Sequence, residues 1–247
     1  MRIHLTGATG YLGSELVRLR PDLSAERVEV RDGEAVEALL ERVRPDVVIH
    51  TAYRQEGPEA RAINVDGSQN VARAAAAVDA RLVHMSTDVV FCGRCKSDGA
   101  YVERDRPCPI TEYGATKADA EHAVVLAHPE ALVVRTSLIY RGPSPSRHEQ
   151  AAVADGNTFY SDEIRNPVAA RDLARALLEL AELDVAGPLH VAGADAVSRH
   201  QFAELIARRP LPSATAPDDR PKNCTLDSSR AQALIRTRLR GAREVLG

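Results

Sequence analysis

The chain alternates short apolar runs with longer amphipathic segments. Each apolar run has the length of a strand, and several end in Gly, Ser, Thr or Asp, which commonly terminate strands and open turns. The longer segments space their apolar residues three or four apart, as one face of a helix does. We expect strands at residues 2–5, 27–30, 46–50, 81–85, 132–136 and 189–191, and helices at 15–19, 34–44, 59–78, 113–125, 172–183 and 198–207.

This alternation of strands and helices predicts an α/β fold. Because crossovers between parallel strands are right-handed, five or six such strands would form a doubly wound parallel sheet with helices on both faces. The character of the chain changes from Arg141 onwards, where Gly, Pro and Ser are frequent and apolar runs are fewer. We therefore predict a core over residues 1–140 and a small C-terminal lobe over residues 141–247, packed on the core and partly interleaved with it.

Composition argues against several classes of protein. With 247 residues, of which 44% are hydrophobic and 27% charged, the chain can bury a core of ordinary size. The net charge of −3 comes from interspersed signs, which argues against a nucleic-acid or membrane-surface partner. No apolar run reaches membrane-spanning length and the first strand begins at residue 2, so we expect a cytoplasmic protein. The oligomeric state stays open, with a homodimer as one outcome.

The four cysteines raise the question of metal or redox chemistry. Cys92 and Cys95 have C-x-x-C spacing, but Cys108 and Cys224 do not supply the second close pair of a structural zinc site. The pair also lies in a Gly-containing loop rather than at the start of a helix, where a thioredoxin-like motif would lie. We therefore expect no metal site, and thiols in a reducing compartment.

The stretch from Thr6 to Gly13 lies between the first strand and the first helix. Its order of strand, glycine-rich turn and helix is the context that a dinucleotide-binding fingerprint requires. Gly7 permits the tight turn, Gly10 lets a pyrophosphate approach the backbone, and Gly13 lets helix and strand pack closely. The start of the helix offers unpaired N–H groups to the phosphates. The alternative is a glycine-rich turn without a ligand.

Polar residues after the next expected strands extend this site. Dinucleotide folds often place an acid about 20 residues beyond the glycines to bind the adenosine ribose, and Asp32 lies near that offset. Asp32 could equally be a loop residue or the N-cap of the helix at 34–44. Thr51, Ala52 and Tyr53 follow a buried strand whose carboxyl end would face a ligand.

A third group of residues suggests acid–base chemistry. Tyr113 and Lys117 are four residues apart and share one face of a helix, and Thr87 ends the strand at 81–85. A tyrosine phenol has a pKa near 10 and is a weak acid–base group at neutral pH unless it is perturbed. A neighbouring ammonium would lower that pKa, and the Thr87 hydroxyl could bind a carbonyl oxygen as charge develops on it. A Tyr-x-x-x-Lys pair alone is common, so the prediction of acid–base chemistry depends on its occurrence together with the glycine-rich turn and Thr87.

Taken together, these residues resemble a known family. TGATGYLG, DVVIHTA, STD and YGATK are similar to motifs of the extended short-chain dehydrogenases/reductases, and within them to the dTDP-4-dehydrorhamnose reductases and their sugar-nucleotide relatives. The later phrases RTS, RDLA, GPLHVAG and SRH resemble the same subgroup. The resemblance covers most of the chain. It implies a Rossmann core, NADPH or NADH as cofactor, and a C-terminal lobe that faces the substrate.

The resemblance also implies roles for individual residues. Thr87, Tyr113 and Lys117 would form the catalytic triad: Tyr113 exchanges a proton with the substrate oxygen, Lys117 binds the nicotinamide ribose, and Thr87 polarises the carbonyl. Asn64 matches the family's helix asparagine, and Asp88 a substrate-side acid. The expected cofactor-binding residues are Gly7, Gly10, Tyr11, Leu12, Gly13, Asp32, Thr51, Ala52, Tyr53 and Lys117.

The chain departs from the family in three places. Residues 18–32 are short for the usual second strand, which leaves the choice between NADH and NADPH open. Leu138 stands where the rhamnose reductases carry a tryptophan, and the segment from Arg141 to Asn166 is shorter than usual, so the substrate pocket is expected to differ. Arg147 and Arg165 are candidate partners of a substrate diphosphate, although such arginines are more often surface charges.

We therefore expect an NAD(P)H-dependent reductase of the keto group of a nucleotide-activated, dTDP-type deoxysugar, with Tyr113 as proton donor and Asp88, Leu138 and Arg165 on the substrate. One alternative is a reductase of a non-sugar ketone in a tailoring pathway, which Leu138 and the shortened lobe permit. Another is a cofactor-binding regulatory subunit without catalysis, because a fold does not establish an activity.

Overall fold

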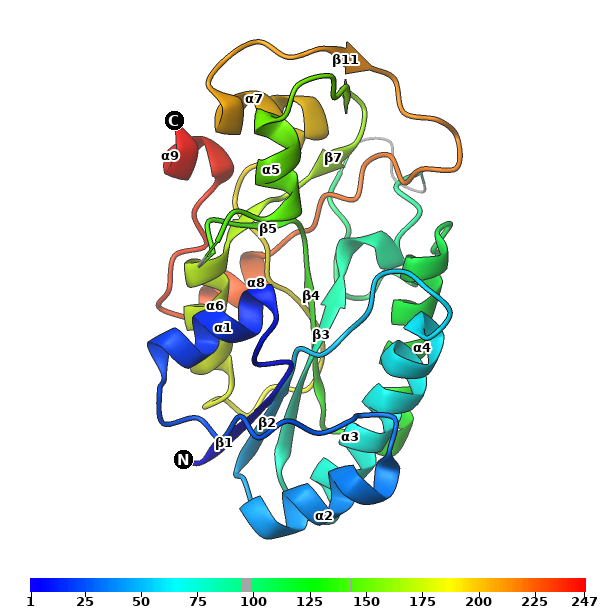
Figure 1. Cartoon of the computed structure of the whole chain (residues 1–247), viewed down its shortest axis with the longest axis vertical. Coiled ribbons are helices and arrows are strands. Elements are labelled where there is room, and N and C mark those ends of the chain that lie inside the picture. The colour runs from blue at the N-terminus through cyan, green and yellow to red at the C-terminus, as the bar shows by residue number, and fades with distance from the viewer. Residues whose placement is uncertain (95–98, 143) are drawn as a thin grey trace.

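The computed structural model of the chain describes residues 1–94, 99–142 and 144–247. At its centre is a five-stranded parallel sheet in the order β1-β2-β3-β4-β9 (Figure 1). Its register places His50 beside His84 and Thr87 beside Thr136, so the carboxyl ends of β2, β3 and β4 lie at the same edge. The strands are β1 (Ile3–Thr6), β2 (Val47–His50), β3 (Arg81–Thr87), β4 (Leu132–Thr136) and β9 (Gly187–His190).

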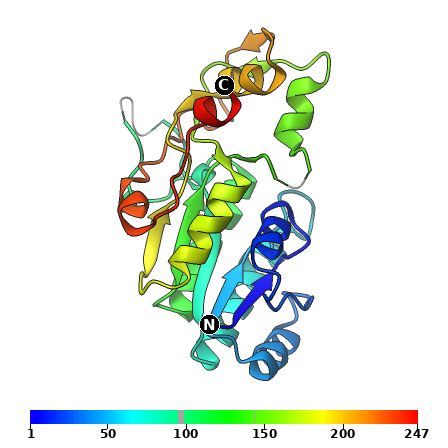
Figure 2. The same ribbon diagram turned by 90° about the vertical axis from the view of Figure 1, so that its left-hand side faces the viewer.

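Helices cover both faces of this sheet (Figures 1 and 2). Side chains alternate between the faces along each strand, so Val83 and Met85 pack with α1 (Tyr11–Leu19) and α6 (Ala170–Leu180), and Leu82 packs on the opposite face. That opposite face is covered by α2 (Gly33–Val43), α3 (Gly67–Ala77) and α4 (Glu112–Ala127). The predicted α/β architecture with a parallel sheet is confirmed.

The prediction of a strand at residues 27–30 is wrong. This part of the chain touches the sheet through one isolated bridge, in which Ser24 pairs with His4 of β1. Val28 and Val30 pack instead with α2 and α3, and Val30 lies directly over Gly67, where a Cβ would come within 2.6 Å of its Cγ2. Their alternation therefore reflects burial against helices rather than strand pairing. In the described part of the chain, β1 is left at the edge of the sheet.

The helix predicted over residues 59–78 contains an irregular turn. Its first part is a π-helical segment, η1 (Ala62–Asp66), which runs directly into α3. Asn64 lies in this turn, fully buried; its side-chain oxygen accepts from Arg54 N–H, and its amide donates to Arg54 O and to the Thr116 hydroxyl. A π turn widens the helix locally and is frequent beside functional sites. Here it connects α3 to α4 next to the expected catalytic residues.

The second half of the chain forms the lobe at the top of Figure 1 and also returns to the core. The strand β9 joins the central sheet, and the helices α6 and α8 (Ser229–Leu234) pack on it. The helices α5 (Arg147–Val153), α7 (Arg199–Ala207) and α9 (Ala242–Leu246) lie above the sheet. The lobe also contains pairs of two-residue strands: β5 (Ile139–Tyr140) with β8 (Val168–Ala169), β7 (Ile164–Arg165) with β10 (Val197–Ser198), and β6 (Phe159–Tyr160) with β11 (Ser213–Ala214).

Capping boxes begin two helices of the lobe. The Ser198 hydroxyl accepts from Gln201 N–H while the Gln201 side chain accepts from Ser198 N–H, so α7 starts as the sequence predicts. The same arrangement between Ser146 and Glu149 begins α5. Both helices therefore have defined first turns, and the residues just after the caps, Arg147 and Arg199, have fixed backbone positions. Within the described ranges, no helix is long and apolar enough to cross a membrane.

Candidate active site

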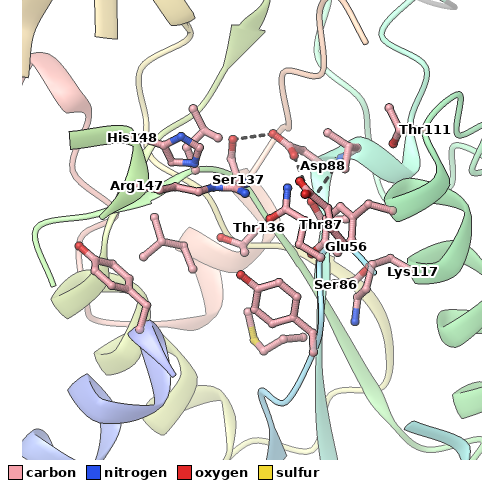
Figure 3. A pocket seen from close by; sticks show the side chains of 18 of the residues that line it. Glu56, Ser86, Thr87, Asp88, Thr111, Lys117, Thr136, Ser137, Arg147 and His148 are labelled. Atoms are coloured by element: carbon pink, nitrogen blue, oxygen red, sulfur yellow. Dashed lines mark hydrogen bonds between the residues drawn. The ribbon is translucent and has the colours of Figure 1, made fainter. Parts of the chain in front are cut away.

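A cavity of about 720 Å³ lies at the carboxyl edge of the central sheet, bounded by the lobe above it. It brings together most of the residues that the sequence singled out. Figure 3 shows Thr87, Asp88 and Lys117 on the core side, with Arg147 and His148 entering from the side of α5. The predicted residues that line it are Gly10, Tyr11, Leu12, Gly13, Thr51, Ala52, Tyr53, Thr87, Asp88, Tyr113, Lys117, Leu138 and Arg165. Gly7 lies directly behind this lining, and Asp32 lies away from it.

The glycine-rich turn has no room for side chains. Gly7 has a φ of +75°, and a Cβ there would come within 2.6 Å of Ala52 N. A Cβ at Gly13 would come within 2.1 Å of Gly7 O, so α1 packs directly on the turn. Gly10, the N-cap of α1, offers no side chain to the first N–H groups of the helix. The turn thus leaves open backbone donors at a helix start on the cavity, which suits the pyrophosphate of a dinucleotide.

The start of α4 positions Tyr113 at the end of β3. The Thr111 hydroxyl accepts from Gly114 N–H at 3.0 Å and caps the helix. A Cβ at Gly114 would come within 2.2 Å of Val89 O, so the first turn of α4 lies directly against η2 (Asp88–Val90), the 3-10 turn that follows Thr87. The glycine therefore allows the approach that brings the Tyr113 phenol beside the Thr87 side chain on the cavity.

The pKa of Tyr113 is raised, which is opposite to the direction expected from the sequence. Burial is the largest cause, and the neighbouring Tyr53 and Asp88 add to it, while Arg147 and the hydrogen bond with Thr87 lower the pKa. The rings of Tyr53 and Tyr113 lie 5.9 Å apart and tilted. The phenol in this state is a neutral proton donor.

Lys117 lies deeper in the site and its ammonium contacts a histidine. Only 3% of the residue is exposed, and its Nζ lies 3.4 Å from His84 Nε2. Burial lowers the pKa of Lys117 to about 8, although Glu121 acts in the opposite direction. The Glu121 carboxylate accepts from the Arg135 guanidinium at 2.8 Å and from the Ser86 hydroxyl at 2.5 Å, so it is already paired. Sequence reasoning missed His84, because it reads as one polar residue inside a strand.

Asp88 is buried at the end of the cavity near the lobe. Its carboxylate accepts from Ser137 Oγ at 2.6 Å and from Thr87 Oγ1 at 3.2 Å, and Arg165 Nε lies 3.7 Å away. Burial raises the pKa of Asp88, and Arg165 and the two hydroxyls oppose this shift. Asp88 thus links the strand-end Thr87 to the lobe.

The arginines on the cavity divide into two groups. Arg165 is committed to the protein, because its guanidinium donates to the carbonyl oxygens of Ile164, Pro221 and Lys222. Arg220 is paired with Glu163. Arg147 and Arg199, in contrast, have no acid within ion-pair distance among the described residues.

Arg199 was not among the sequence candidates. Its Nη2 lies 3.2 Å from His148 Nδ1, and burial lowers the pKa of its guanidinium to about 10. The Ser-Arg-His phrase was part of the family resemblance, but the sequence assigned no role to Arg199. Only the fold brings the start of α7 to the cavity. A partly buried cation without an acid partner in the described residues is a candidate for binding an anionic ligand.

Three further sequence candidates occupy defined places. Asp32 accepts from Ala35 N–H at 3.1 Å as the N-cap of α2, which is the alternative weighed for it, and its contact with a ribose stays a prediction. Leu138 lies on the cavity wall. Cys92 and Cys108 have their sulfur atoms 3.2 Å apart, and Cys95 lies outside the described residues. In the described ranges, no group of three or more His, Cys, Asp or Glu could hold a metal ion.

Comparison with known proteins decides the family. The family model described as RmlD substrate binding domain matches residues 1–247. The chain belongs to this family. It is 35% identical to the dTDP-4-dehydrorhamnose reductase of Mycolicibacterium smegmatis, in an alignment covering 99% of this chain and 84% of that protein. It is also 30% identical to methionine adenosyltransferase 2 subunit beta of Rattus norvegicus, over 94% of this chain and 82% of that one.

The solved structures agree with the RmlD assignment. The dTDP-4-dehydrorhamnose reductase from Bacillus anthracis in complex with NADP matches with a TM-score of 0.87 at 26% identity, covering 99% of this chain and 95% of that one. The resemblance to sugar-nucleotide reductases of the extended short-chain type is therefore confirmed, and the chain is an enzyme of the NAD(P)-dependent RmlD-like reductase family.

Proposed function

We propose that this RmlD-family chain reduces the keto group of a nucleotide-activated, dTDP-type deoxysugar with NADPH or NADH. The observation that carries the proposal is the meeting of Thr87, Tyr113 and Lys117 on one cavity that the glycine-rich turn also borders. The relative from Bacillus anthracis is in complex with NADP, which favours NADPH.

Each residue of the triad has a role that its surroundings support. The bound nicotinamide cofactor supplies the hydride. Tyr113, kept neutral by burial, donates its proton to the substrate oxygen as negative charge develops there, and Thr87 donates a hydrogen bond to the same oxygen. Lys117, one turn after Tyr113 on α4, contributes positive charge to the site, which stabilises the phenolate that remains once Tyr113 has given up its proton. Gly10, Gly13 and the first turn of α1 would hold the pyrophosphate.

The free arginines support a phosphorylated substrate. Arg147 and Arg199 line the cavity without acid partners in the described part of the chain, and Figure 3 shows Arg147 on the opposite side from Lys117. Arginines bind diphosphates through charge-assisted hydrogen bonds, which a neutral ketone could not accept in the same way. This favours a nucleotide sugar over a non-sugar ketone. Arg165, which the sequence nominated, would instead orient Asp88 and the segment at Pro221.

The direct test is the Tyr113→Phe variant. Oxidation of NADPH and NADH is followed with a panel of dTDP-linked 4-ketosugars and of simple ketones, and we expect turnover to fall by about 10²- to 10⁴-fold with cofactor affinity retained. Tyr160→Phe is the matched control, since Tyr160 lies outside the cavity lining. Full activity of the Tyr113→Phe variant would show that Tyr113 is not the proton donor. Turnover of simple ketones but not of ketosugars would show that the substrate is a non-sugar ketone.

A second candidate is a cofactor-binding subunit without reductase activity. Its support is the 30% identity to a protein named as subunit beta of a methionine adenosyltransferase. Saturable binding of NADPH by the wild-type protein, with no oxidation across the whole panel, would favour this candidate over the reductase.

A further inference from the structure

Three neighbouring strands of the sheet carry a buried histidine. His4 on β1, His50 on β2 and His84 on β3 are each no more than 1% exposed. The first two are hydrogen-bonded within the core: His4 to Ser24, and His50 to Thr6 through Nδ1 and to Ser68 through Nε2. His84 differs in its partner: its Nε2 faces the Lys117 ammonium, while its Nδ1, like His4 Nε2, has no partner among the described residues.

Among the described residues, the one side-chain acceptor within hydrogen-bond distance of the Lys117 Nζ is His84 Nε2. Within the described residues, no acid lies within ion-pair distance of its Nζ. Glu121, one turn further along α4, is paired with Arg135 of β4. The ring of His50 on β2 lies 5.3 Å from the ring of His84. Tyr113 lies one turn earlier on α4, and Ser68 and Asn64 on the neighbouring helix are uncharged. The His84 imidazole is thus the group that can accept from the ammonium.

We propose that His84 is a positioning residue for Lys117, whose Nε2 accepts a hydrogen bond from the ammonium and holds it at the floor of the cavity. Its consequence for catalysis rests on the proposed function, but the contact itself does not. For Nε2 to accept, the proton of the neutral imidazole must be on Nδ1. That buried N–H then has no partner among the described residues, which is unfavourable for stability. An apolar residue would avoid this cost, and the contact with the Lys117 ammonium is the interaction that a histidine adds at this position.

The electrostatics are consistent with this role. Burial lowers the pKa of His84 well below its usual value, and Lys117 and His50 lower it further, so the ring is neutral and does not repel the ammonium. A neutral acceptor replaces part of the hydration that Lys117 loses on burial. Loss of the acceptor would make the buried ammonium less favourable, and the pKa of Lys117 would fall below its value of about 8.

The chain allows a direct measurement, because it contains only three lysines, Lys96, Lys117 and Lys222. Lysine labelled with ¹³C at Cε gives three signals that titrate with pH, and the signal lost in a Lys117→Arg variant identifies Lys117. We expect a midpoint near 8 in the wild-type protein and a midpoint about one unit lower, a tenfold weaker proton affinity, in His84→Leu. His84→Gln keeps an acceptor oxygen and should restore the wild-type midpoint. His4→Leu, which removes another buried strand histidine, should leave it unchanged.

Two outcomes overturn the proposal: an unshifted Lys117 midpoint in folded His84→Leu, or an equal shift in His4→Leu. If His84→Leu does not fold, His84→Asn is compared with His84→Gln, because the shorter amide cannot reach the ammonium and only its midpoint should fall. This titration needs no substrate, so it stands apart from the Tyr113→Phe test of the proposed function. In the active enzyme, the alkaline limb of the profile of kcat/KM against pH should move with the Lys117 midpoint.

Discussion

The Tyr11 hydroxyl accepts a hydrogen bond from Gly142 N–H at 2.6 Å, which joins the glycine-rich turn of the core to the lobe. The same hydroxyl donates to Glu149 Oε2 at 3.2 Å, and Glu149 closes the capping box of α5. The contact requires glycine at 142, since a Cβ there would come within 2.6 Å of the Tyr11 ring. The first turn of α5, which carries Arg147 and His148 into the cavity, is therefore anchored beside the expected pyrophosphate site.

The Tyr11→Phe variant should loosen this connection while keeping the ring. We expect a loss of about 1–2 kcal/mol in the free energy of unfolding, because the Gly142 and Glu149 hydrogen bonds disappear. The KM for the substrate should rise more than kcat falls, because α5 loses its fixed position. Urea unfolding and steady-state kinetics measure the two effects, with Tyr160→Phe as control. Unchanged stability and KM together would show that the contact does not orient α5.

Arg199→Met should weaken binding of a phosphorylated substrate. A charge-assisted hydrogen bond contributes about 1.5–3 kcal/mol, so its removal should raise the KM for a dTDP-linked ketosugar by roughly 10- to 150-fold with a smaller change in kcat. The variant should be at least as stable as the wild type, because it removes a partly buried cation that has no acid partner among the described residues. Arg208→Met, at the far end of α7, is the control. Equal KM values in wild type and variant would remove Arg199 from the substrate site.

Acid should destabilise the fold through the histidines that burial or partial burial keeps neutral. Burial lowers the pKa to about 3 for His50 and His148 and to about 4 for His190, whereas each has a pKa near 6.5 in the unfolded chain. Between pH 6.5 and about 4 the unfolded state therefore binds more protons, and the free energy of unfolding falls as pH falls, by up to about 1.4 kcal/mol per pH unit for each histidine.

Urea unfolding between pH 7 and pH 4.5 measures this loss. His148→Gln removes one of the three groups, so its stability should fall less steeply over the same interval. A wild-type stability that does not change with pH in this range would show that these imidazoles are not held neutral in the native state.

Much of the core could be predicted from local sequence. The glycine turn, the helix capped by Ser198 and the Tyr113–Lys117 pair depend on residues close together in the chain, and each signal follows from backbone geometry. The apolar residues Val28 and Val30 led to the wrong prediction of a strand, because burial against α2 and α3 produces the same alternation of apolar and polar residues as a strand. What distinguishes them from a strand is that they pack on helices instead of pairing with another strand, and one of these helices, α3, is remote in sequence.

By itself, the sequence determined the order of strands and helices, the turn that only glycines can form, and the types of residue at the ends of β2 and β3, since these depend on neighbours within a few positions. Only the tertiary structure decided that Lys117 contacts His84, that Arg165 is committed to backbone carbonyls, and that Arg199 reaches the cavity uncompensated by an acid in the described part of the chain. Charge, burial and pairing are properties of groups brought together across many residues, so their electrostatic outcome follows from the packed fold.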